Sequence, residues 1–359
     1  MVDDAPRQAR ADRYLCAMTR AGVALPLLVL LLGCASGAGG PARPAIAWQA
    51  AHGREHPLAG RIRDVAAERW IDEDALLDAL ARADLVLLGE RHDHPDHHAL
   101  QARILAAMVA RGRRPAVAFE MLDAADAPAV AAAVAPGAGA GPGTGPREPA
   151  ARAEALREAV AWDESGWPDW ALYAPVFEAA LAADLPIVPA NLTRTELHAL
   201  GRGGPSALPA TRRAALGLDA PADPDERRAL LEQIREVHCG HAPEAALERM
   251  VDVQRAWNAQ LARALADAAR PPPTGVGSGA VLIAGNEHVR RDRGAPRWLA
   301  RFAPDARVAS VGLVELDPEQ PDATPEPDAP FDYVWLTPRI DLVDPCEKYR
   351  ESLEQPRRR

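Results

Sequence analysis

The chain has 359 residues, of which 48% are apolar and 26% charged, and this is the composition of a globular protein rather than a disordered one. Its formal net charge of −10 and its 4% of aromatic residues count against a nucleic-acid binder, which needs a basic surface. Its length fits one large domain or two modest ones. The cysteines form no CxxC pair, which excludes a zinc ribbon and a covalent CxxCH haem attachment.

The N-terminal segment has the pattern of a lipoprotein signal peptide. Arginines precede the apolar run 21–33, which is too short to span a bilayer, and the run ends at Cys34 in a sequence that resembles a bacterial lipobox. We therefore expect residues 1–33 to be removed, with Met1 or Met18 as the start, and the Cys34 side chain to carry lipid. Residues 34–60 would be a Gly/Pro-rich tether. The alternative is a buried helix of a longer domain.

The remaining cysteines follow from this interpretation. Removal of Cys16 and acylation of Cys34 leave Cys239 and Cys346 as two thiols in an oxidising compartment. We expect them to form a disulfide that closes a loop of about a hundred residues. Two separately buried thiols are the alternative.

Short apolar segments predict the strands of the fold, and the first four are near-continuous apolar runs, as in strands buried on both faces. The predicted strands are 84–89, 115–120, 186–191, 280–285, 307–316 and 332–337. Helical periodicity marks 95–108, 170–183 and 225–237. This alternation predicts an α/β fold with a mostly parallel sheet flanked by helices.

The stretch 195–269 has no strand pattern, so we expect an all-helical subdomain inserted between the third and fourth core strands. Residues 61–194 and 270–350 would form the α/β core. Residues 351–359 would be a solvated basic tail.

Polar side chains follow the ends of the first four predicted strands. Glu90 and His92 follow the first strand, Glu120 ends the second, Asn191 ends the third and His288 follows the fourth. Because the carboxyl ends of parallel strands meet at one edge of a sheet, we expect these side chains to form one site.

The segment from His92 to His98 contains four histidines. Pro95 suits the start of a helix, so His94 is the expected N-cap, with His97 on the packed face and His98 on a neighbouring stripe. These histidines can ligate a metal or haem iron, or can serve only as caps and solvated side chains.

Further candidates lie in the insert and after the fourth strand. His238 and His241 share a face if the helix continues, whereas Gly240 would end it in the alternative. Arg290 can hold a carboxylate such as a haem propionate, or simply begin the next helix. HExxH and GxSxG are absent, which counts against a zincin and an α/β-hydrolase.

Taken together, these segments resemble the ChaN family of haem-binding lipoproteins, within the Tiki/erythromycin-esterase-like superfamily. The resemblance covers about 83–349 and includes, in order, LLGERHDHPDHHALQ, AFEML, WDESGWPDWALYAPVFEAAL, PIVPANLTR, HCGH, LIAGNEHVRRDRGAP and YVWLTPR. It implies an α/β core with a helical subdomain, a lipid anchor and haem binding linked to iron uptake. Trp257-Asn258 departs from the family pattern, in which an Arg-Asp pair is expected.

Two functions remain. In the first, the protein binds haem non-covalently for uptake or storage, on the periplasmic side of the outer membrane. It would act alone or as a homodimer, with an outer-membrane haem receptor as partner. Haem iron accepts histidine or tyrosine, and the axial candidates are His92, Tyr173, His238 and His241. Other expected haem contacts are His98, Asn191, His288 and Arg290.

In the second function, the strand-end side chains form a divalent-metal hydrolase. Glu90, His92, Glu120 and His288 would then bind the metal ion or activate water. A scaffold with a vestigial site is a third, less specific alternative.

Overall fold

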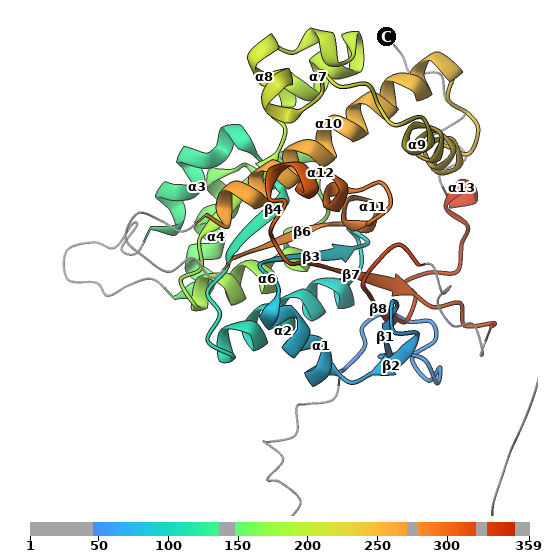
Figure 1. Cartoon of the computed structure of the whole chain (residues 1–359). Coiled ribbons are helices and arrows are strands. Elements are labelled where there is room, and N and C mark those ends of the chain that lie inside the picture. The colour runs from blue at the N-terminus through green and yellow to red at the C-terminus, as the bar shows by residue number, and fades with distance from the viewer. Residues whose placement is uncertain (1–45, 136–147, 271–278, 321–328, 349–359) are drawn as a thin grey trace, which may run out of the picture. The chain divides into compact units, whose positions relative to one another are not determined.

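The computed structural model describes residues 46–135, 148–270, 279–320 and 329–348. The predicted signal peptide, the Cys34 lipidation site and the basic tail lie outside the described residues. In the described part, a central sheet carries helices on both faces (Figure 1).

The sheet has eight strands in the order β2-β1-β8-β7-β3-β6-β4-β5, and the six from β8 to β5 run parallel. The predicted mostly parallel sheet is therefore confirmed. The six parallel strands match the six predicted segments: β3 (Leu85–Glu90), β4 (Ala116–Asp123), β5 (Ile187–Asn191), β6 (Ala280–Gly285), β7 (Val308–Glu315) and β8 (Tyr333–Thr337).

An antiparallel hairpin, which the sequence did not predict, extends the β8 edge of the sheet. It consists of β1 (Ile62–Asp64) and β2 (Arg69–Ile71), with β1 pairing to β8. Three-residue strands are too short to show an alternating pattern, so the sequence carries no signal for them.

Alternate residues of each strand enter two separate cores. Val86, Leu88 and Phe119 face one core, whereas Leu87 and Ala118 face the other. The first core contains α1 (Glu73–Arg82), α2 (Pro95–Ala110), α3 (Ala127–Val134), α4 (Pro149–Ala159), α5 (Trp162–Ser165) and α6 (Trp170–Ala182). The second contains α7 (Arg194–Gly203), α8 (Ala210–Leu216), α10 (Glu244–Ala268), α11 (Asn286–Val289) and α12 (Ala295–Phe302). This two-sided burial explains why the central strands are apolar throughout.

The predicted helical insert lies between β5 and β6. It begins at α7, where Thr193 and Glu196 form a capping box. Its α9 (Pro224–Val237) packs on α10 through a small apolar cluster that includes Leu230 and Val251. Figure 1 shows α7 and α8 on the far side of α10 from the sheet, and α9 beside the N-terminal end of α10.

The predicted disulfide is present. Cys239 follows α9 and Cys346 lies in α13 (Pro345–Lys348), and their Cα atoms are 5.7 Å apart. The bond ties the helical insert to the C-terminal segment. Among the described residues, no helix is both long and apolar enough to cross a bilayer.

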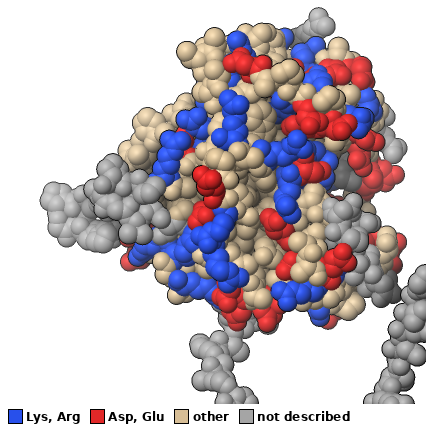
Figure 2. Space-filling model, in the orientation of Figure 1, with Lys and Arg blue, Asp and Glu red and all other residues tan. Residues whose placement is uncertain are grey.

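Acidic and basic side chains are mixed over the face shown in Figure 2. Many form pairs, such as Arg103 with Glu73 and Arg307 with Asp84. The excess of negative charge is therefore not gathered into one broad area of this face.

Candidate functional site

Four parallel strands bring their polar ends to one edge of the sheet. The ends of β4, β5 and β6 meet at Glu120. Its Oε2 accepts a 2.8 Å hydrogen bond from the Gly285 amide, and its backbone carbonyl accepts one of 2.8 Å from Asn191 Nδ2. Its Oε1 lies 3.3 Å from His288 Nε2. We call Glu90, His92, Glu120, Asn191 and His288 the strand-edge cluster.

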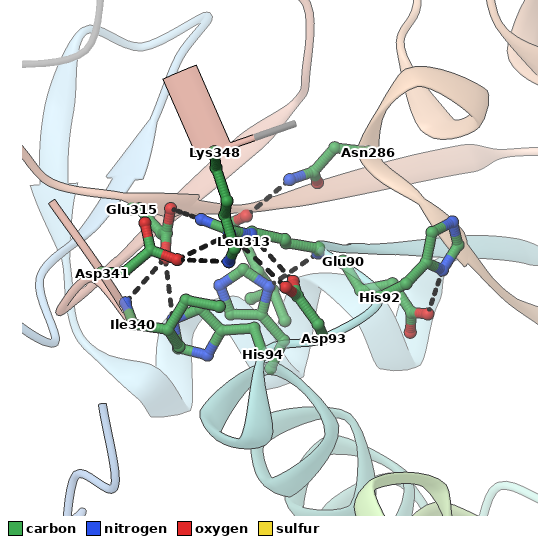
Figure 3. Close-up of polar contacts among 12 residues, drawn as sticks. Glu90, His92, Asp93, His94, Asn286, Leu313, Glu315, Ile340, Asp341 and Lys348 are labelled. Atoms are coloured by element: carbon green, nitrogen blue, oxygen red, sulfur yellow. Dashed lines mark hydrogen bonds and ion pairs between the residues drawn. The ribbon is translucent and has the colours of Figure 1, made fainter. Parts of the chain in front are cut away.

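Glu90 is the buried anchor of the cluster, and its carboxylate is fully hydrogen-bonded. Tyr173 donates to Oε1 at 2.6 Å, and Gln101 donates to Oε2 at 2.8 Å. The His92 ring donates from Nδ1 to Oε1 at 2.9 Å, a contact that Figure 3 shows. Burial opposes ionisation, but the charge of His98 and the hydrogen bonds from His92 and His98 hold the pKa of Glu90 well below its usual value.

His98 supplies the charge that balances Glu90. Its Nε2 faces the His92 carbonyl at 3.1 Å, and its Nδ1 faces Gln101 Oε1 at 3.3 Å and Glu90 Oε2 at 3.4 Å. Both ring nitrogens thus face acceptors, which requires both to carry protons. Burial opposes this, but the Glu90 charge raises the pKa of His98. The pair is a buried imidazolium and carboxylate.

His92 is the most accessible ring of the cluster. Its side chain is 34% exposed, and Nε2 makes no hydrogen bond within the described part of the chain. The ring meets the edge of Trp167 at a centroid distance of 5.1 Å. Burial opposes protonation, but Glu120 and Glu90 raise the pKa of His92 to about 9. His92 is therefore protonated at neutral pH, with Nδ1 held by Glu90 and Nε2 without a hydrogen bond in the described residues.

The loop that carries His92 is anchored from behind. Arg91 pairs with Glu315 at 2.7 Å and with Asp93 at 2.8 Å, and lies 3.6 Å from Asp341. Lys348 of α13 pairs with Asp341, as Figure 3 shows. The C-terminal segment thus braces the loop between β3 and α2.

His288 is fixed by α10. Its Nδ1 lies 2.7 Å from Asn258 Oδ1, and its ring lies against Trp257 with a centroid distance of 5.2 Å. Burial would raise the pKa of Glu120, but the nearby His288 and His92 rings lower it. Glu120 is therefore an ionised carboxylate between two histidine rings.

Residues 76–299 match the family described as haem-binding uptake, Tiki superfamily, ChaN, and the match spans well over half of the chain. The chain belongs to the ChaN family. The resemblance found in the sequence is confirmed, and the strand-edge cluster lies within the matched part of this ChaN family member. No curated protein matches the chain significantly.

The chain is similar to several solved structures. The structure described as cofacial haem binding to ChaN of Campylobacter jejuni has a TM-score of 0.57 and 22% identity, covering 76% of this chain and 95% of that one. The type III effector HopBA1 is similar with a TM-score of 0.37 and 13% identity, over 74% of this chain and 93% of that one. A mutant of the erythromycin esterase EreC has a TM-score of 0.39 and 13% identity, covering 82% and 86% respectively.

Two of the predicted haem contacts are fully buried. Tyr173 is fully buried rather than facing a cleft, and its hydroxyl is committed to Glu90. Burial and the Glu90 charge also raise its pKa, which disfavours the phenolate that an iron would bind. His98 is fully buried with both nitrogens engaged. Both residues support Glu90 from beneath the site.

The histidines of the insert do not join the strand-edge cluster. The α9 helix ends at Val237 and His238 is its C-cap, so the alternative in which His238 and His241 share a helical face is wrong. His238 Nδ1 donates to the Ile234 carbonyl at 2.7 Å, and His241 is exposed. Cys239 and Gly240 both have positive φ, which turns the chain away from the helix.

Two further histidines of the His92–His98 segment and the predicted contact Arg290 take structural positions. His94 is the N-cap of α2, as predicted, and accepts from the Asp96 amide at 3.2 Å. His97 is fully buried and stacks on His94. Arg290 donates to Asp292 at 2.9 and 2.7 Å, so its charge is already paired within the turn after α11.

The metal alternative gains no support from the geometry. Within the described residues, no group of three or more histidine, cysteine, aspartate or glutamate side chains is placed to hold a metal ion. Both oxygens of Glu90 and of Glu120 already face protein donors or rings.

Three residues that contact the strand-edge cluster were not predicted from the sequence. Gln101 lies on the packed face of α2, Asn258 lies within α10, and Trp167 precedes α6. Only Asn258 gave a signal, because it belongs to the Trp257-Asn258 pair that departs from the ChaN pattern. The other two contact the cluster through tertiary packing that the sequence does not reveal.

Proposed function

We propose that the chain binds haem non-covalently and that His92 Nε2 is the axial ligand of the iron. Membership of a haem-binding uptake family supports the haem. The partly exposed His92 ring, whose Nε2 makes no hydrogen bond in the described residues, is the observation that carries the assignment of the ligand, and iron binding there would displace the Nε2 proton. Haem is the cargo of the protein in this proposal.

The residues around His92 fit an iron ligand. Histidines that bind metals usually donate their other ring N–H to a carboxylate or carbonyl, which fixes the ring and raises its basicity. Glu90 accepts the Nδ1 proton of His92 in this way, at 2.9 Å. Trp167 adds an apolar wall at the edge of the ring.

We also propose where the protein lies in the cell and how it assembles. The protein is anchored through lipid on Cys34, faces the periplasm from the outer membrane, and exchanges haem with an outer-membrane receptor. Haem binding to ChaN of Campylobacter jejuni is described as cofacial. A homodimer of this chain would bring two His92-bound haems face to face. Lipid anchoring is tested by palmitate labelling, which should enter the wild type and be lost in Cys34→Ala.

Haemin titration of the full chain tests the ligand. The wild type should give a saturable Soret shift, and His92→Ala should weaken haem affinity by about 10- to 100-fold because the ligand is lost. His198→Ala is the matched control, because His198 is exposed on α7. The double variant His238→Ala/His241→Ala should also bind as the wild type does. Unchanged affinity in His92→Ala would overturn the assignment of His92, and no Soret shift in the wild type would overturn haem binding.

A further inference from the structure

A pocket adjoins the strand-edge cluster, and Asn191 of the cluster and Trp167 both line it. Its volume is about 510 Å³, within the range of small-molecule sites. The ends of β4 and β5, the connection from α4 to α6 and one side chain of α10 line it. We call it the Trp167 pocket. His92 and His288 do not line it, although each packs on a tryptophan that does.

Two buried polar atoms of the Trp167 pocket have no partner. Asn191 is 7% exposed and donates from Nδ2 to the Glu120 carbonyl, which can only accept, so its amide orientation is fixed. Its Oδ1 is left as a buried acceptor with no hydrogen bond in the described structure. Trp257 Nε1 is likewise a buried donor without a partner there. Both atoms are inaccessible to solvent, so they lie behind the wall of the pocket and do not contact a ligand in it.

The charge of the pocket is negative. Asp123, Asp126 and Glu164 line it, against the single guanidinium of Arg194. Burial and the neighbouring Asp123 carboxylate raise the pKa of Asp126, so the negative charge at this point is not fully compensated. A cation would relieve this repulsion, whereas the propionates of a haem would add to it.

The walls of the pocket are aromatic. Trp162, Trp167 and Trp257 all line it. Tryptophan is the best cation–π partner among the side chains, and aromatic walls are the usual means of holding a quaternary ammonium group. Trp162 is held in place by hydrogen bonding of its Nε1 to the Pro168 carbonyl at 2.9 Å.

We infer that the Trp167 pocket binds a small organic cation of the quaternary ammonium type. The cation lies among the tryptophans and carboxylates that line the pocket. This ligand is distinct from haem, and its site does not include the His92 Nε2 atom.

Calorimetric titration of the full, haem-free chain tests this inference with choline as the probe. Tetramethylammonium, which lacks the hydroxyl, and 3,3-dimethylbutan-1-ol, which lacks the charge, are titrated beside it. We expect the neutral alcohol to bind at least about 10-fold more weakly than choline, and tetramethylammonium to bind about as tightly as choline. Phosphocholine is a fourth probe, because stronger binding of it identifies a lipid headgroup and weaker binding identifies the free amino alcohol.

A charge variant provides the second arm. Asp126→Asn should weaken choline binding about 5-fold, because it removes one carboxylate without changing its size. Asp163→Asn is the matched control, because Asp163 is exposed and paired with Arg157 and does not line the pocket. Haemin affinity should be the same in both variants. The absence of choline binding at concentrations up to about 20 mM, well above the range of about 1 μM–1 mM in which enzymes bind their substrates, overturns the inference. Equal binding of choline and its neutral analogue, or equal loss in the two variants, also overturns it.

Discussion

Asn258 Oδ1 lies 2.7 Å from His288 Nδ1, and this contact requires a proton on Nδ1. The Asn258 amide donates from Nδ2 to the Arg293 carbonyl at 2.9 Å, so its oxygen must be the atom that faces the ring. His288 therefore donates from Nδ1 and presents Nε2 to Glu120. The neutral amide of Asn258 thus accepts the Nδ1 proton of His288, whereas a carboxylate at this position would accept it and add a negative charge.

Loss of this acceptor should destabilise the fold. Asn258→Leu leaves the buried Nδ1–H of His288 unpaired, and we expect the free energy of unfolding to fall by about 1–3 kcal/mol. Urea unfolding measures the change. Asn258→Asp retains an acceptor for His288, so it should cost less than the leucine variant. Equal stability of Asn258→Leu and the wild type would show that the contact contributes nothing.

The Glu90–His98 pair should be among the most sensitive parts of the site. Glu90→Gln leaves the buried imidazolium of His98 without its counter-charge, and breaking a buried pair costs about 3–5 kcal/mol. Glu158→Gln is the control, because Glu158 is exposed on α4, and a change there should stay within about 0.5 kcal/mol. A loss in Glu90→Gln no larger than in the control would contradict a charged pair at this position.

Several features of this site were predictable from the sequence, and others were not. Glu90, Glu120 and Asn191 converge because they end neighbouring parallel strands, a consequence of topology that continuous apolar strands already indicate. The direction in which the Tyr173 side chain points was not predictable from the sequence. Helical periodicity places it on a stripe of α6, but only the packing of α6 on α2 turns that stripe toward Glu90.

The histidine-rich segment shows the same limit. Pro95 signals the start of α2 and makes His94 a cap, which the structure bears out. The sequence cannot assign charge to the following histidines, because His97 is neutral and His98 cationic for reasons of environment. Burial lowers the pKa of His97 well below its usual value, whereas Glu90 raises that of His98.

The stability of the haem-free protein should decrease at alkaline pH. The folded-state pKa of His92 is raised to about 9, above the value near 6.5 of an unfolded histidine, so its stabilisation is fully present below about pH 6.5. It is lost as the pH rises through 9. Because the side chain is a third exposed, solvent screening limits the loss to about 1 kcal/mol.

Urea unfolding at pH 6.5, 8 and 9.5 measures this contribution as the difference between the wild type and His92→Gln. The glutamine variant keeps a donor toward Glu90 but does not titrate, so it corrects for Glu120, Asp93 and the other groups near the ring. A difference that does not change with pH would contradict the raised pKa of His92.

The disulfide should stabilise the junction between the helical insert and the C-terminal segment. Cys239 and Cys346 are separated by 107 residues, and loop-entropy arguments give about 4–5 kcal/mol for such a loop, with measured values usually about 2–4. The nearby Lys348–Asp341 ion pair is exposed and should contribute less than about 1 kcal/mol, so it cannot replace the covalent bond. Cys239→Ser/Cys346→Ser should therefore lower the Tm by about 4–10 °C. Dithiothreitol should lower the Tm of the wild type to that of the double variant and leave the variant unchanged. Thiol titration of the denatured, unreduced protein should find neither cysteine free, and two free thiols there would end the claim.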